Sequence, residues 1–381
     1  MHDLMHDLAR SVSADVYWNS DQDSVEVIGK RTYHLQIDQR KFPNMTQVVL
    51  DKKPLYLRTF LAFKPLYAFS IFNSGLSINL LEIFSELKFL RALDLTNGGI
   101  REVPTSIENL IHLRYLNLSE NKFEVLPDSI TLLPNLQYLN LSFNKALQEL
   151  PKELGNMQNL RDLNLFESDY RLTHMPCGLS RLTNLRSLPL FIVDEKIGAC
   201  SIIELEDLKL RGEMNIKFSK DFQNYSCGGR KILKNKDLNE LRLEFNCLPI
   251  DDDGMLDDLC PNMSLKKLTI WNYVSPQFPA WLMESQLPNL VEVSLENCYG
   301  FENIPPFGNL QFLKKLRLKI VVGITEMGDE FHANGGFPSL QELILIKMRR
   351  LQKWSNSHDD VFPKLQSLII IDCAELEMLR S

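Results

Sequence analysis

Residues 113–118 read LRYLNL, residues 136–141 read LQYLNL and residues 160–165 read LRDLNL. The shared pattern, L-x-x-L-x-L, places leucines at alternate positions, as in a short strand with one buried face. Further copies begin at Leu90 and Leu185, and a second run begins at Leu238, Leu265, Leu290, Leu313, Leu340 and Leu365. Neighbouring copies within a run lie 23–27 residues apart. Such a regular period indicates one structural coil for each copy.

The period and template are those of leucine-rich repeats. They predict an α/β solenoid of horseshoe form, with a concave parallel β-sheet and an irregular or short-helical convex side. Leu116 and Leu118 should point into the core, and Asn121 should satisfy backbone groups at the turn that follows. One coil cannot bury its own apolar edges, so each coil must pack against the next.

A proline follows the first four strands of the first run on the expected convex side, at Pro104, Pro127, Pro151 and Pro176. Proline presets its own φ and donates no hydrogen bond, which suits a single-turn helical return. The residues up to each proline read REVP, EVLP, QELP and THMP, without the glycine usual in extracellular plant repeats. This difference favours the intracellular subclass.

The array divides into five segments. Residues 1–30 begin with apolar residues at helical spacing and are interpreted as a short helical segment. Weak strand-like pieces in residues 31–89 predict degenerate capping repeats. Residues 90–190 are regular repeats, residues 191–237 are an irregular insert with one degenerate repeat at Met214 and Ile216, and residues 238–381 are the second run.

Composition excludes several classes of function. The formal net charge of −7 argues against a nucleic-acid binder. No apolar run is long enough to span a bilayer, and the N-terminus does not resemble a signal peptide. The seven scattered cysteines include no C-x-x-C pair, which argues against a disulfide framework or a zinc site. We therefore expect a cytoplasmic or nuclear protein without a membrane span.

Enzymatic motifs are weak. His2 and His6 are spaced as in H-E-x-x-H zinc proteases, but Asp3 stands where glutamate is needed and no third ligand follows. A metal hydrolase using His2 and His6 is thus the enzyme-class alternative. We find neither a phosphate loop nor a G-x-S-x-G elbow. We expect no enzyme, no catalytic residue and no metal.

The expected concave face carries the candidate binding residues. Its aromatic side chains are typical anchors for a protein partner, and three basic residues share one strand between acidic neighbours. The candidate residues are Tyr115, Tyr138, Phe166, Trp271, Lys315, Arg317 and Lys319. The alternative is that they are ordinary solvated residues joined in cross-strand ion pairs.

The opening MHDLMHDLA resembles the MHD segment of plant NBS-LRR disease-resistance proteins of the coiled-coil, resistance-gene-analogue class. The similarity continues through residues 90–119, through LRSLPLFIV at 185–193, and through residues 265–282, which end in FPAWL.

The resemblance implies an immune-receptor repeat domain that recognises a pathogen effector or a guarded host protein. It also implies packing against a nucleotide-binding region that the repeats hold closed. His2 would contact ADP only in a full-length relative, because the coiled coil and phosphate loop are missing here; no other cofactor is expected. A truncated product, a partial gene model or a fragment would share this sequence. The remaining alternative is a generic repeat scaffold or adaptor.

Overall fold

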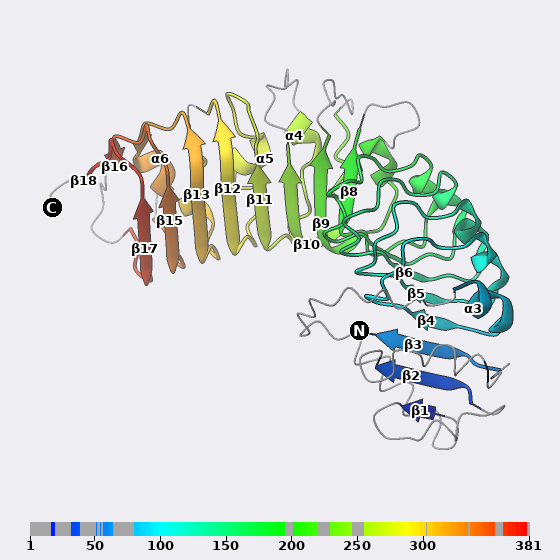
Figure 1. Cartoon of the computed structure of the whole chain (residues 1–381). Coiled ribbons are helices and arrows are strands. Elements are labelled where there is room, and N and C mark those ends of the chain that lie inside the picture. The colour runs from blue at the N-terminus through cyan, green and yellow to red at the C-terminus, as the bar shows by residue number, and fades with distance from the viewer. Residues whose placement is uncertain are drawn as a thin grey trace. The chain divides into compact units, whose positions relative to one another are not determined.

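The computed structural model describes residues 17–19, 32–38, 51, 54, 56–63, 80–194, 201–219, 229–245, 255–301, 303–333, 336–354 and 361–378. The chain forms two units, Met1–Leu188 (unit 1) and Pro189–Ser381 (unit 2). Each unit is built on its own parallel sheet (Figure 1).

Unit 1 contains a seven-stranded sheet whose strands follow chain order and run parallel. The strands are β1 (Tyr17–Asn19), β2 (His34–Asp38), β3 (Thr59–Phe63), β4 (Ala92–Asp94), β5 (Tyr115–Asn117), β6 (Tyr138–Asn140) and β7 (Asp162–Asn164). Leu116, Leu139 and Leu163 lie opposite one another on β5, β6 and β7 and are fully buried. The repeat template therefore forms one strand per coil, as predicted.

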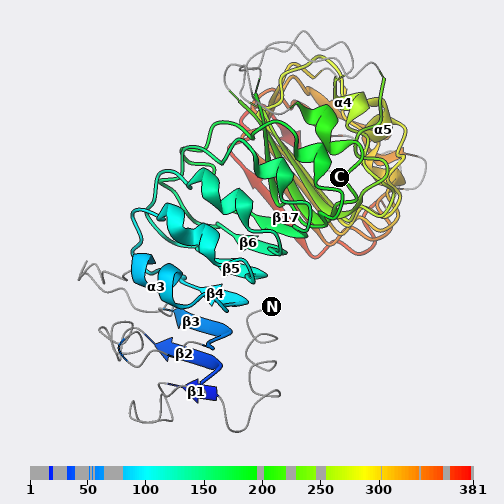
Figure 2. The ribbon, with the colours of Figure 1, turned by 90° about the vertical axis from the view of Figure 1, so that its right-hand side faces the viewer.

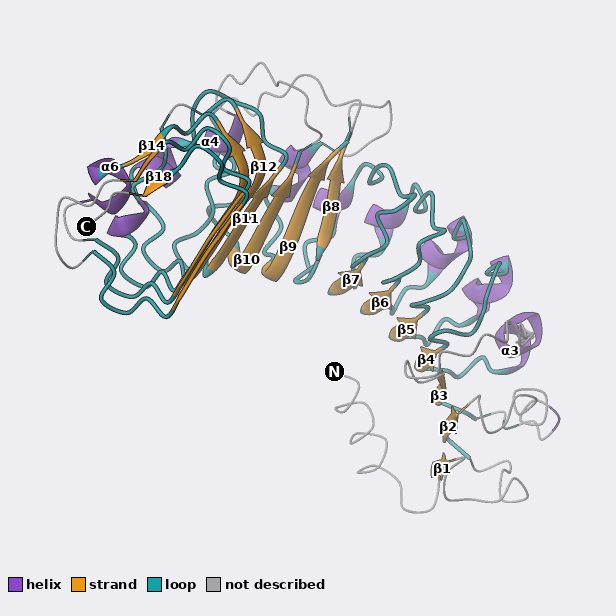
Figure 3. Ribbon diagram, turned by 60° about the vertical axis from the view of Figure 1, so that its left-hand side comes forward, coloured by secondary structure: helices purple, strands orange, loops and turns teal. Residues whose placement is uncertain are grey.

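Short helices form the other side of unit 1, away from the strands (Figures 2 and 3). They are the α-helix α3 (Leu80–Glu86) and the 3₁₀ helices η2 (Thr105–Asn109), η3 (Asp128–Leu132), η4 (Leu154–Asn156) and η5 (Leu179–Arg181). Pro104 and Pro127 precede η2 and η3 with φ of −66° and −68°, values that the proline ring favours. The predicted short-helical return is confirmed.

A buried polar ladder holds the turns of unit 1. The Asn121 amide donates to the carbonyls of Leu95, Leu118 and Ser119, and its Oδ1 accepts the Ile100 N–H. One coil later Asn144 repeats the role, and then Ser168 bonds the Leu141 carbonyl. At the corresponding repeat positions of unit 2, Cys298 and Cys373 have Sγ atoms 3.7 Å and 3.9 Å from the carbonyl oxygens of Ile270 and Leu345.

Unit 2 contains an eight-stranded parallel sheet, seen side by side in Figure 1. Its strands are β8 (Leu190–Val193), β9 (Arg211–Phe218), β10 (Asp237–Glu244), β11 (Lys267–Trp271), β12 (Glu292–Tyr299), β13 (Lys315–Val322), β15 (Glu342–Ile346) and β17 (Ser367–Ile371). A small parallel sheet joins β14 (Glu326–Met327), β16 (Lys353–Trp354) and β18 (Glu377–Met378). The helices are η6 (Ile202–Leu205), α4 (Met255–Asp258), α5 (Ala280–Met283), η7 (Phe307–Asn309) and α6 (Asp329–His332).

Two predicted segments differ from the structure. Residues 17–19, within the expected helical segment 1–30, form β1, which pairs with β2; residues 1–16 lie outside the described residues. The expected insert 191–237 is part of the sheet, because β8 pairs with β9 and β9 with β10. The copy that begins at Leu185 forms an isolated bridge from Ser187 to Asp162, and the regular strand β8 begins at Leu190, directly after Pro189. The degenerate repeat at Met214 and Ile216 is confirmed as β9.

Candidate functional site

The outward face of the unit 1 sheet carries an aromatic platform. Tyr115 and Tyr138 are register partners on β5 and β6, with ring centroids 4.6 Å apart and planes 5° apart. Since strand side chains alternate, both rings project away from the buried Leu116 and Leu139. Both residues are half-buried. The two predicted anchors thus lie together and form one flat surface.

Carboxylates border this platform. The Asp94 carboxylate accepts hydrogen bonds from the Thr96 N–H and hydroxyl and from the Asn117 amide. Burial raises the pKa of Tyr115, with a further contribution from Asp94, so its phenol stays protonated and can donate. Burial also raises the pKa of Asp162 to about 6, against a hydrogen bond from Ser187 that lowers it. The surface suits a partner group that is apolar or cationic, or that accepts hydrogen bonds.

Phe166 lies in the turn after β7. The sequence pattern predicts it on the sheet, so this prediction is wrong. Its ring meets that of Phe143 edge to face, with centroids 5.6 Å apart. Both rings remain exposed, at 46% and 43% of their surface. Phe143 has a φ of 59°, which aims its side chain out of the turn instead of into the core. Phe143 and Phe166 thus form a second aromatic pair, beyond the carboxyl ends of β6 and β7.

Charges alternate across the outward face of unit 2. One row of register partners runs through five adjacent strands, β10 to β13 and β15, as Glu240, Lys267, Glu292, Lys315 and Glu342. Lys267 lies 3.2 Å from Glu240, and Lys315 lies 3.7 Å from Glu292 and 3.9 Å from Glu342. Opposite charges directly across a parallel sheet attract, so the row stabilises its own register.

The other predicted residues of unit 2 are also paired. Arg317 Nε and Lys319 Nζ lie 3.6 Å and 3.5 Å from the Glu296 carboxylate. The Arg242 guanidinium lies over the Trp271 ring, 5.1 Å from its centroid. Lys315, Arg317 and Lys319 therefore share β13, as predicted, but they form a balanced ionic surface instead of a positive patch. A shallow depression of about 410 Å³ lies over this network.

Sequence reasoning missed Arg242, Glu240 and Glu244, which complete the unit 2 network. It also missed a set of residues at the start of the unit 1 strands, including Arg58 and Arg91. Aligning the repeats copy by copy would have revealed both sets, because register partners occupy equal positions in successive copies.

His2 and His6 lie outside the described residues, so their predicted roles stay predictions. Within the described ranges no three His, Cys, Asp or Glu side chains gather in a way that could hold a metal ion. In the same part of the chain no helix has the length and apolarity needed to cross a bilayer.

Residues 68–379 match the family model described as a leucine-rich repeat region. The chain belongs to the leucine-rich-repeat family. This repeat protein is also similar in structure to the Leptospira interrogans leucine-rich-repeat protein LIC12759, with a TM-score of 0.54 and 23% identity. That likeness covers 90% of this chain and 88% of the other, and it supports the solenoid fold.

The curated relatives of this repeat protein are plant disease resistance proteins. It is 30% identical to At3g14460 of Arabidopsis thaliana over 99% of this chain, and 30% identical to RGA4 of Solanum bulbocastanum over 53%. RGA2 of Solanum bulbocastanum is 28% identical over 52% of this chain. The matches cover 28%, 22% and 22% of those proteins, so the chain spans about a quarter of their length.

Proposed function

We propose that this chain is the repeat region of a plant immune receptor and binds a pathogen effector or a guarded host protein. The observation that carries the proposal is the similarity of the whole chain to a plant disease resistance protein. The two sheet faces support it, because rigid sheets with aromatic platforms and fixed charges suit protein recognition. We propose a binding role without catalysis, inside the plant cell, as the glycine-free proline motifs favour.

In a longer receptor the same region would pack against the nucleotide-binding part and hold it closed. His2, within the MHD sequence, would then contact ADP. Both roles belong to the whole receptor and follow from the resemblance to its family.

Co-expression in leaf tissue tests the proposal. This chain and the coiled-coil and nucleotide-binding part of a plant NBS-LRR receptor would be produced as separate polypeptides, and cell death and co-precipitation would be measured. We expect this chain to suppress cell death caused by an autoactive nucleotide-binding part and to co-precipitate with it. No association and no suppression would contradict the restraining role.

Recognition is tested with a panel of purified pathogen effectors. We expect at least one to bind, and Tyr115→Ala with Tyr138→Ala to weaken that binding. Leu132→Ala on the helical side, where Leu132 is 62% exposed, is the matched control. Binding lost through the control variant and kept by the tyrosine variant would place recognition elsewhere.

A further inference from the structure

A row of arginines lies along the amino-terminal ends of the unit 1 strands. Each residue lies immediately before the strand position of its coil, and backbone hydrogen bonds link each to the one before. Arg91 N–H donates to the Arg58 carbonyl, Arg114 to Arg91, Gln137 to Arg114, Arg161 to Gln137 and Arg186 to Arg161, at 2.7–2.9 Å. Five arginines thus occupy six consecutive positions, which we call the arginine row.

Within the described part of unit 1, the row has no acidic partners. No carboxylate lies within ion-pair distance of these five arginines among the residues that the structure describes, whereas the lysines of β11 and β13 in unit 2 are paired with glutamates. Arg58, Arg91, Arg114 and Arg161 are exposed. Like charges at neighbouring positions repel and destabilise the fold. The row therefore costs stability, and a negatively charged partner would remove that cost.

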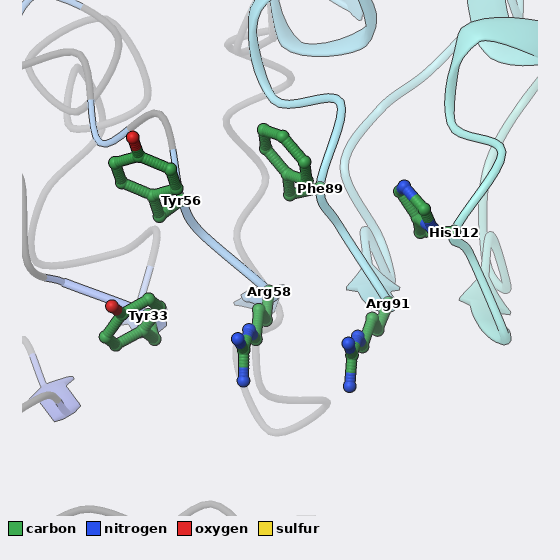
Figure 4. A pocket seen from close by; sticks show the side chains of 6 residues that line it. All are labelled: Tyr33, Tyr56, Arg58, Phe89, Arg91 and His112. Carbon is green, nitrogen blue, oxygen red and sulfur yellow. The ribbon is translucent and has the colours of Figure 1, made fainter.

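An aromatic shelf lies beside the first part of the row. Tyr56, Phe89 and His112 stack in sequence with centroids 5.9 Å apart at each step. Tyr56 and Phe89 are 55% and 48% exposed. Figure 4 shows the three rings side by side with the Arg58 and Arg91 guanidinium groups below them. Together with Tyr33 they line a pocket of about 330 Å³.

We propose that the arginine row and aromatic shelf bind an extended acidic segment of a partner polypeptide. Its carboxylates would pair with the guanidinium groups, and one aromatic or large apolar side chain would occupy the shelf. The row spans five coil steps of ~4.8 Å, about 24 Å, which an extended segment of seven or eight residues covers.

A polypeptide fits better than a nucleic acid. Gln137 interrupts the row, and the Asp162 carboxylate directly follows Arg161, where a continuous phosphate chain would be repelled. An acidic peptide can instead place uncharged residues opposite Gln137 and Asp162, because its carboxylates are separate. The proposed site is distinct from the tyrosine platform and does not depend on the proposed immune function.

Fluorescence anisotropy with a labelled ten-residue peptide tests the proposal. The peptide has glutamate at alternate positions, serine between them and one terminal tyrosine. We expect binding that weakens with salt, and an increase in Kd of about tenfold or more when Arg91, Arg114 and Arg161 are all changed to glutamate. Phe89→Ala should raise Kd about three- to tenfold without changing the salt dependence.

The matched control is a triple variant of unit 2 that combines Lys266→Glu, Lys314→Glu and Lys364→Glu at exposed positions. It changes the net charge by the same amount as the arginine triple variant. It should leave Kd within about twofold, and thermal unfolding should show that both triple variants are folded. Equal weakening by the two triple variants would overturn the proposal, because only overall charge would matter. Tighter binding of a single-stranded oligonucleotide than of the peptide would overturn it as well.

Discussion

The backbone N–H of Asn121 donates to the Asn144 Oδ1 across two adjacent coils, at 2.8 Å. The same Asn144 amide donates to the carbonyls of Leu118 and Leu141, so one side chain satisfies three buried backbone groups. Asn144 is fully buried. The turns of unit 1 are therefore bonded to their neighbours through side chains as well as through the sheet.

Asn144→Ala should lower the free energy of unfolding by about 2–4 kcal/mol, because it leaves buried backbone groups without partners. Urea denaturation measures the loss. Asn135→Ala is the control: the Asn135 amide also donates to a backbone carbonyl, that of Ile111, but at an exposed position. A loss of about 0.5 kcal/mol is expected there. Equal losses at the two sites would contradict the structural role of the ladder.

Asp162 should make stability depend on pH. Burial raises the pKa of Asp162 from its ordinary value of 3.8 to about 6 in the folded chain, so the folded chain holds more protons between these values. Stability attributable to this group is therefore present below pH 4, falls as pH rises to about 6, and stays low above it.

Asp162→Asn should therefore be more stable than the wild type at pH 7.5, by at most about 1 kcal/mol after solvent screening. Thermal unfolding measured from pH 3.5 to 8 checks this, and the two curves should converge at the acidic end. A constant difference over the whole range would show that charge is not the cause.

Lys236 is buried, and its ammonium group donates to the carbonyls of Leu205, Glu206 and Leu208 at the end of η6. Lys236→Met keeps the aliphatic length but leaves these carbonyls without that donor. We expect a loss of about 2–4 kcal/mol in urea denaturation. Lys234→Met, at an exposed position, should change stability by less than about 0.5 kcal/mol. A loss at Lys236 no larger than at Lys234 would refute the bracing role.

Lys319 and Glu296 should be energetically coupled. A double-mutant cycle with Lys319→Met and Glu296→Gln should give a coupling of about 0.5–1 kcal/mol at low salt, and less in about 1 M NaCl. The control cycle combines Lys319 with Glu240, which do not form an ion pair with each other, and it should give no coupling. Salt-independent coupling would point to packing instead of charge.

The strand positions could be predicted from the sequence, because leucines at 116, 139 and 163 can be buried in only one register. The pairing of Lys315 with Glu292 and Glu342 does not follow from the sequence alone, since the copies vary between 23 and 27 residues in spacing and cross-strand partners depend on their alignment. Phe166 was placed on the sheet because the template does not specify where a strand ends. The copy at Leu185 is predicted, but the template does not show that its strand divides into a bridge at Ser187 and β8 from Leu190.

Unit 1 has the amides of Asn121 and Asn144 at a repeat position where two copies of unit 2 have the thiols of Cys298 and Cys373, and a thiol is the weaker donor. Replacing a weak donor costs little stability. The positions of Cys298 and Cys373 should therefore change more readily during evolution than those of Asn121 and Asn144.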